Sequence, residues 1–123
     1  MSHNWTLQGK YGFYRTGTEI LGGPVVHLAA AGLMDFDGTG KFTAYQNASD
    51  GGSYVANNQS TGFCHVYPSG VFTLSDTTYV ATDQFAIDLT KVQTVGVVVD
   101  GGNELHALST KAGRAVLFHA KKM

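Results

Sequence analysis

Turn-forming residues recur at short intervals along the whole chain. They occur as Gly22-Gly23-Pro24, Asp37-Gly38-Thr39-Gly40, Asp50-Gly51-Gly52, Pro68-Ser69-Gly70, Ser75-Asp76-Thr77-Thr78 and Asp100-Gly101-Gly102-Asn103. Such clusters of Gly, Pro, Asp, Asn and Ser interrupt regular structure. The segments between them are rich in Val, Phe, Tyr and Thr and alternate with a period of two, as strands do. This spacing leaves no room for long helices and favours short antiparallel strands.

The alternating segments predict strands near residues 5–16, 24–36, 40–48, 53–67, 70–75, 84–90, 92–99, 104–110 and 114–121. Joined by tight hairpins, they form a meander, and closing the meander into a barrel removes its exposed edges. We therefore predict an all-β fold, a single antiparallel up-and-down β-barrel of about eight strands. The 123 residues suffice for one barrel domain, over 1–123, in which we expect residues 1–6 to be disordered.

The clearest hairpin centres on Asp37-Gly38-Thr39-Gly40. Asp37-Gly38 can adopt the positive φ of a tight turn, and Gly40 suits a following bulge. With Asp35, the same residues partly match a calcium-binding loop. The twelfth position of that loop is Gln46, where calcium needs a bidentate carboxylate. We interpret the segment as a turn.

Composition excludes several classes of function. Eight basic and nine acidic residues give a net charge of −1 without a basic stripe, so we expect no nucleic-acid partner. A single cysteine excludes an internal disulfide and a cysteine-rich zinc site. No phosphate-binding loop motif is present, and we expect no cofactor.

The sequence shows neither a membrane helix nor a secretory signal. Its longest apolar stretch, 25–34, is interrupted by His27 and Gly32 and falls short of the roughly 20 residues that a membrane helix needs. The first residues lack a basic region followed by an apolar run. We expect a cytoplasmic protein with no membrane partner.

Three segments occur in an order typical of one group of proteins: Gly9-Lys10-Tyr11-Gly12-Phe13, then Gly32 to Gly40 (Gly-Leu-Met-Asp-Phe-Asp-Gly-Thr-Gly), then Val98 to His106 (Val-Val-Asp-Gly-Gly-Asn-Glu-Leu-His). They resemble small bacterial calycin-like proteins, most of them uncharacterised, and the similarity runs from about residue 7 to residue 121. The resemblance implies a lipocalin-type barrel that holds a small apolar ligand. A few such barrels perform cofactor-free lyase, isomerase or cyclase chemistry.

One segment departs from the group, which usually has Gly-Thr-Tyr-Thr-Val where this chain has Gly62-Phe63-Cys64-His65-Val66. If Cys64 faces the interior, the loss of a tyrosine ring opens space for a ligand. Phe118 stands where glycine is common in the group and would partly refill that space.

Alternate residues of a barrel strand face the interior, so the phase of the alternation decides which side chains can meet a ligand. One phase is almost continuously apolar, as an interior or a ligand pocket would be. It contains Tyr11, Phe13, Val26, Leu28, Met34, Phe36, Phe42, Ala44, Gln46, Cys64, Val66, Phe72, Leu74, Val97, Val99, Leu105, Ala107, Val116 and Phe118. From this phase we predict the ligand-binding residues Phe13, Met34, Phe36, Phe42, Gln46, Cys64 and Phe118.

The opposite phase contains four of the five histidines together with several aromatic residues. Its members include Tyr14, His27, Asp35, Tyr45, Phe63, His65, Tyr67, His106 and His119. One interpretation makes this face an outer wall that packs against another subunit, so we expect a homo-oligomer. The other makes part of it a functional cluster, because histidine exchanges protons near neutral pH. Our candidate acid–base residues are His65, His27 and Tyr45, with Tyr11 as a hydroxyl donor inside the barrel.

Metal binding would need these histidines to converge from different strands, with Asp35 as an oxygen ligand. No pair has the close spacing of a known metal site, so we expect none. We therefore hypothesise a barrel that binds a small apolar or aromatic molecule. It would be either a cofactor-independent lyase, isomerase or cyclase or a non-catalytic carrier, and a third alternative is a structural module for assembly.

Overall fold

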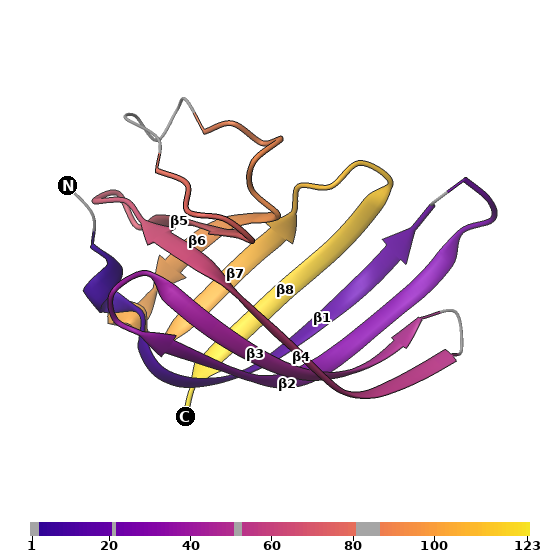
Figure 1. Cartoon of the computed structure of the whole chain (residues 1–123), viewed down its shortest axis with the longest axis horizontal. Coiled ribbons are helices and arrows are strands. Elements are labelled where there is room, and N and C mark those ends of the chain that lie inside the picture. Colours follow the sequence, from indigo (N-terminus) through magenta and orange to yellow (C-terminus); the bar gives the residue numbers. More distant parts are fainter. Residues whose placement is uncertain (1–2, 21, 51–52, 81–86) are drawn as a thin grey trace.

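The chain folds into a closed barrel of eight antiparallel strands (Figure 1). The computed structural model describes residues 3–20, 22–50, 53–80 and 87–123. Its strands are β1 (Gln8–Glu19), β2 (Val26–Asp37), β3 (Lys41–Asp50), β4 (Ser53–Val66), β5 (Val71–Ser75), β6 (Thr94–Val99), β7 (Glu104–Ser109) and β8 (Arg114–Lys122). Each strand pairs with the next, and β1 also pairs with β8, which closes the sheet. The predicted all-β, up-and-down barrel is confirmed.

A ninth strand predicted over 84–90 is not seen in the part of the chain that is described. Residues 81–86 lie outside the described residues, and residues 87–90 form no strand. The helices described are two three-residue 3-10 turns, η1 (Asn4–Thr6) and η3 (Asp100–Gly102). No helix among the described residues has the length and apolar character to cross a membrane.

The N-terminal turn η1 is attached to the barrel by hydrogen bonds of His3 and Asn4. The His3 amide donates to the Val66 carbonyl over 2.8 Å, and the Val66 amide donates to the Asn4 side-chain oxygen over 2.8 Å. These bonds attach η1 to the end of β4, because β3 pairs with β4 only as far as Phe63.

The hairpin between β2 and β3 has the predicted turn. One carboxylate oxygen of Asp37 accepts hydrogen bonds from the amides of Thr39 (2.7 Å) and Lys41 (3.1 Å). Gly38 and Gly40 have φ values of 82° and 112°, in the region that favours glycine. The Asp37 carboxylate therefore stabilises the turn itself.

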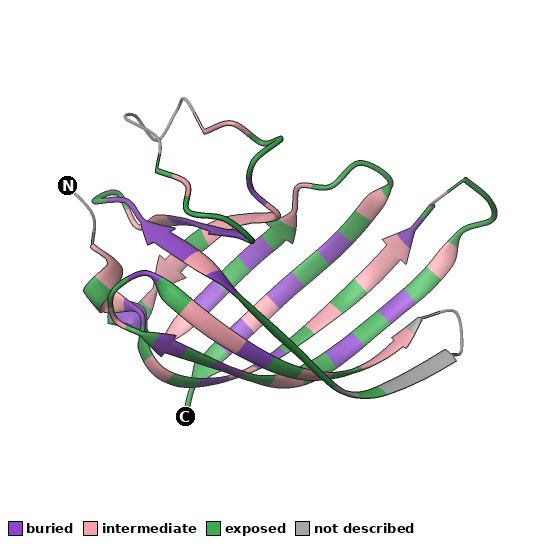
Figure 2. Ribbon diagram, in the orientation of Figure 1, coloured by how far each residue is buried: buried purple, intermediate pink, exposed green. Residues whose placement is uncertain are grey.

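Buried and exposed side chains alternate along the strands (Figure 2). The inward phase matches the predicted one along β1, β2 and β8, whereas Val97 and Val99 on β6 were placed wrongly. Val97 is exposed, and the pairing of Val98 with Leu105 puts the even-numbered positions of β6 inside. The segment from Val95 to Val99 is apolar in both phases apart from Gly96, so its pattern could not define the inward side.

The two ends of the barrel differ. At one end lie η1, η3 and the densest part of the core, where the Tyr11 hydroxyl donates to the Gly102 carbonyl. Leu7, Tyr11, Phe36, Phe72 and Leu105 are almost fully buried. At the other end the described pairing of β4 with β5 covers only Phe63–Val66, so the first half of β4 is paired with β3 alone (Figure 1). This second end is the open one.

Candidate ligand-binding site

A cavity of about 100 Å³ lies inside the barrel toward its open end. The described residues that line it are Phe13, Arg15, Met34, Phe42, Ala44, Gln46, Ser60, Leu74, Gln93, Thr94 and Phe118. A smaller space of about 50 Å³ adjoins it and shares Arg15, Gln93, Thr94 and Phe118. Its remaining lining residues are Ser109, Lys111, Arg114 and Val116.

The inward-facing residues of the strands change from apolar to charged along the barrel interior. On β1 the inward phase runs from Tyr11 and Phe13 to Arg15 and Glu19, and on β8 Arg114 precedes Val116 and Phe118 in the same phase. The Phe13 and Phe118 rings lie 5.5 Å apart and form an aromatic wall. The cavity is therefore apolar toward the core and polar toward the open end.

Arg15 is the charged side chain that lines both spaces. Its Nη2 donates to the Gln46 side-chain oxygen over 3.2 Å, whereas its buried Nε has no hydrogen-bond partner. Burial lowers the pKa of the Arg15 guanidinium, and the positive charge of Arg114 lowers it further. The guanidinium stays protonated at neutral pH, so Arg15 gives the cavity wall a positive charge, while its Nε is an unpaired donor buried beside it.

Glu19 offsets part of this positive charge. It pairs with Arg114 across the β1–β8 ladder, and Arg114 Nε lies 2.9 Å from Glu19 Oε2. The Glu19 side chain is only 3% exposed, so the pair lies largely out of solvent. Two arginines and one glutamate leave this region with an excess positive charge, which favours an anionic ligand.

The structure places five of the seven predicted ligand-binding residues on the wall of the larger cavity. They are Phe13, Met34, Phe42, Gln46 and Phe118. Phe36 and Cys64 face inward as predicted but belong to the packed core and do not line either space. Burial raises the pKa of the Cys64 thiol to about 12, so the thiol remains protonated at neutral pH.

The four candidate acid–base residues are not brought together. Tyr11 is inside, while His27 and Tyr45 are exposed on the outer face of β2 and β3. Tyr45 lies opposite Leu33, six residues from His27, so about 20 Å of strand separates the two. His65 belongs to the outward phase yet is buried, with its ring 4.4 Å from the Tyr67 ring. Burial lowers the pKa of His65.

Arg15, Glu19 and Arg114 were not among the sequence-based candidates. The period-two alternation could have identified them, because these residues continue the inward phase of Tyr11 and Phe13 on β1 and of Phe118 and Val116 on β8. Gln93 and Thr94 had no such signal, since they stand where the described β5–β6 connection rejoins the sheet.

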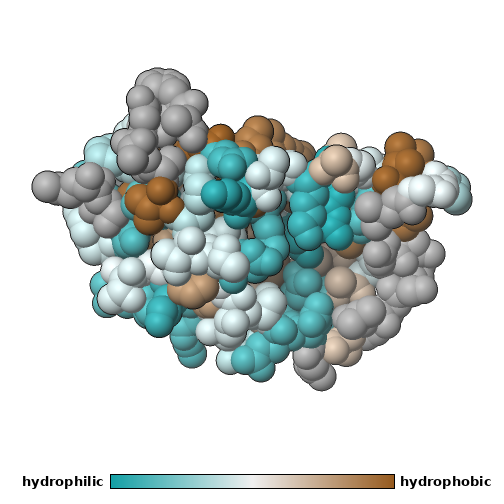
Figure 3. Space-filling view, turned by 45° about the horizontal axis from the view of Figure 1, so that its top comes forward, coloured by the Kyte–Doolittle hydropathy of each residue, from teal (hydrophilic) through white to brown (hydrophobic). Residues whose placement is uncertain are grey.

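A second, larger hollow of about 460 Å³ lies on the outer surface. The described residues that line it are Asp35, Asp37, Lys41, Phe42, Thr43, Thr61, Gly62, Phe63 and Asp76. Five of its nine lining residues are exposed, and the Asp37 carboxylate is already bonded to the turn. Figure 3 shows a mainly hydrophilic face of the molecule with separate apolar patches and a recess near its centre. The interior cavity, with its apolar wall and the Arg15 guanidinium, is the stronger candidate.

No family model, curated protein or solved structure matches this chain. The calycin-type assignment therefore remains a resemblance in sequence pattern, and the site is interpreted from its own chemistry.

Proposed function

We propose that this barrel binds a small amphipathic molecule whose apolar part lies against Phe13 and Phe118 and whose anionic group meets Arg15. The observation that carries the proposal is the buried Arg15 Nε, which has no partner among the described groups. An unsatisfied buried donor costs about 1–3 kcal/mol. A carboxylate in the cavity that accepts from this guanidinium would form a charge-assisted hydrogen bond and offset part of the cost of the buried charge.

The size of the cavity limits the ligand. Drug-sized ligands usually occupy 300–1,000 Å³, whereas the two adjoining spaces here measure about 100 and 50 Å³. An apolar cavity of about 150 Å³ can hold benzene. The site therefore suits a single aromatic ring or a short aliphatic chain that carries a carboxylate.

The lining favours binding without turnover. No histidine, tyrosine, cysteine or carboxylate is among the described residues that line the two spaces, and their one acid–base side chain, Lys111, is exposed to solvent. A lyase, isomerase or cyclase of the hypothesised kind would need such a group within reach of the ligand. The Tyr11 hydroxyl, the candidate inside the barrel, is bonded to the Gly102 carbonyl at the closed end.

Benzoate and its neutral counterpart benzamide test the proposal directly. We expect NMR titration or calorimetry to show benzoate binding at least about tenfold tighter, because only benzoate carries the charge that Arg15 recognises. Arg15→Met should abolish this preference, and Lys10→Met, which removes a positive charge from an exposed position, should retain it. Equal affinities in the native protein, or binding of neither probe, would contradict the proposal.

We also propose that the chain self-associates through its outer face. Exposed apolar or aromatic side chains on this face support the idea: Tyr14, Leu33, Tyr45, Leu108 and Leu117. Leu108 and Leu117 lie opposite each other on β7 and β8. Light scattering at micromolar concentration should show a species larger than the 13.1 kDa chain, and a purely monomeric protein would refute self-association.

A further inference from the structure

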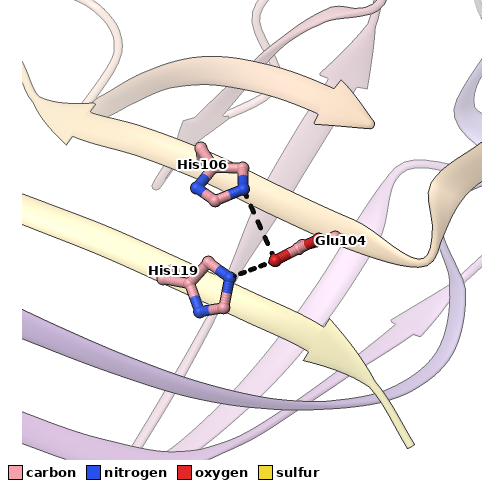
Figure 4. A network of polar contacts seen from close by, with 3 residues as sticks. All are labelled: Glu104, His106 and His119. Carbon is pink, nitrogen blue, oxygen red and sulfur yellow. Dashed lines mark hydrogen bonds and ion pairs between the residues drawn. The ribbon is translucent and has the colours of Figure 1, made fainter. Parts of the chain in front are cut away.

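The outer face of β7 and β8 carries two histidines and a glutamate that lie together. His106 and His119 occupy directly opposed positions of the antiparallel ladder, with ring centroids 4.7 Å apart. Glu104 precedes His106 by two residues on β7, so the period of two places both side chains on the same face. Figure 4 shows the Glu104 carboxylate beside the two imidazole rings and directed toward both.

Their donor atoms are close enough to share one metal ion. Glu104 Oε1 lies 2.6 Å from His119 Nε2 and 3.5 Å from His106 Nε2, and one ligand atom from each residue lies within 4.8 Å of the others. In a tetrahedral zinc site with metal–ligand distances of 2.0–2.2 Å, donor atoms stand roughly 3.3 Å apart. Small side-chain rotations would bring the three atoms to that spacing, with the strands unchanged.

From this geometry we propose that Glu104, His106 and His119 form a binding site for a divalent transition metal ion such as Zn²⁺. Two imidazoles and a carboxylate are ligands that Zn²⁺, Ni²⁺ and Cu²⁺ accept readily, whereas Mg²⁺ and Ca²⁺ prefer oxygen ligands. Three protein ligands leave a fourth position of the ion for water. The site thus differs from the closed four-ligand sites that hold structural zinc.

The surroundings of the cluster are compatible with an ion. The three residues are partly or largely accessible, so a hydrated ion can reach them without an opening of the barrel. The Tyr14 ring lies 5.2 Å from the His119 ring and limits its rotation. Lys121, opposite Glu104 in the ladder, is the nearby positive charge that opposes binding, so we expect an affinity in the micromolar range.

A bound ion should also raise the thermal stability of the barrel. A metal bound by His106 and His119 would connect β7 to β8, the strand that pairs with β1 to close the barrel. Binding to the folded state alone raises thermal stability with the logarithm of the ratio of free ligand to Kd. At a free Zn²⁺ concentration about 100 times Kd, a chain of this size should gain roughly 10 °C in Tm.

Calorimetry with untagged, metal-free protein tests the site, because a polyhistidine tag would bind the same ions. We expect one Zn²⁺ per chain, a similar or stronger response to Ni²⁺ and Cu²⁺, and none to Mg²⁺. His106→Gln and His119→Gln should each weaken Zn²⁺ binding at least tenfold and remove most of the Tm gain. His27→Gln, at an exposed histidine on β2, should change neither.

Two further measurements separate loss of a ligand from loss of the fold. Glu104→Gln keeps the shape of the side chain but removes its charge, so it should weaken binding while the circular dichroism spectrum stays that of the native barrel. Co²⁺ should give visible absorption bands in the native protein that both histidine variants lose. The proposal is overturned if millimolar Zn²⁺ gives neither heat nor a Tm shift, or if Zn²⁺ binds the His106→Gln/His119→Gln double variant as tightly as the native chain.

Discussion

The Arg15 side chain on β1 reaches Gln46 on β3 across the intervening strand β2, with Nη2 and Oε1 3.2 Å apart. This crossing depends on small residues. Ala30 lies opposite Arg15, and Gly32 lies opposite Gln46, both in the inward phase of β2. A large side chain at Ala30 would occupy the path of the guanidinium, and at Gly32 even a Cβ would collide with the Tyr45 carbonyl oxygen. The polar half of the interior is thus created as much by Ala30 and Gly32 as by the arginine.

Replacing Arg15 by an apolar residue should increase the stability of the fold and weaken the binding of an anionic ligand. We expect Arg15→Met to raise the free energy of unfolding by about 1 kcal/mol, because an apolar side chain of similar length removes a buried charge whose Nε is unsatisfied. Urea unfolding at pH 7 measures the change. Arg15→Lys, which keeps a buried charge, should give no such gain. A loss of more than about 1 kcal/mol in Arg15→Met would mean that the guanidinium mainly supports the fold.

The buried Tyr11 hydroxyl should contribute to stability rather than to chemistry. Its hydrogen bond to the Gly102 carbonyl joins β1 to η3 at the closed end. Tyr11→Phe leaves that carbonyl without this partner and should lower the free energy of unfolding by about 1–2 kcal/mol. Tyr14→Phe, at an exposed position of the same strand, should stay within about 0.5 kcal/mol of the native protein. If both variants have native stability, the Tyr11 hydrogen bond is not stabilising.

The barrel could be predicted because its hairpins are determined by residues that are close together in the sequence. The Asp37-Gly38 turn fixes the register of β2 and β3, and the alternation along β1, β2 and β8 defines their inward side. The inward side could not be predicted where a segment is apolar in both phases. On β6 the inward side is set by partners on β7, through Val98 opposite Leu105 and Gly96 opposite Ala107. The sequence of β6 alone does not reveal these cross-strand contacts.

The candidate site could be predicted in its apolar half and at Gln46, but not at its charged residues. Phe13, Met34 and Phe118 were found by phase, because an apolar residue in a continuous inward phase is what an interior requires. Arg15 and Arg114 follow the same phase but contradict the expectation that an interior is apolar. The His106–His119 pair was missed for another reason: it depends on the exact register between β7 and β8, which the sequence does not state.

Cys64 should make the protein sensitive to alkaline pH. Its pKa of about 12 in the folded state exceeds the value of about 8.5 typical of an unfolded chain. Between these values the folded chain keeps a proton that the unfolded chain has lost, so stability is fully present below about pH 8.5 and decreases as pH rises toward 12. Urea unfolding should show the native protein losing up to about 1.4 kcal/mol per pH unit more than Cys64→Ala in this window.

The same thiol should be inert in the native state. We expect iodoacetamide to modify Cys64 only when denaturant is added, because burial suppresses the thiolate that would react. Rapid modification at pH 8 without denaturant, or parallel stability curves for the native protein and Cys64→Ala above pH 9, would show that the thiol is accessible to water.

His65 should cause the opposite dependence at acidic pH. Burial lowers its pKa in the folded state below the value of about 6.5 in an unfolded chain. Below pH 6.5 the unfolded chain therefore binds a proton before the folded chain does, and stability is lost as pH falls through the lowered pKa. Urea unfolding between pH 7 and pH 5 should show a steeper loss for the native protein than for His65→Gln, which cannot titrate. His27→Gln removes an exposed histidine and should leave the native slope unchanged. A native protein whose stability falls no faster than that of His65→Gln would show that His65 takes up its proton as readily in the folded chain as in the unfolded one.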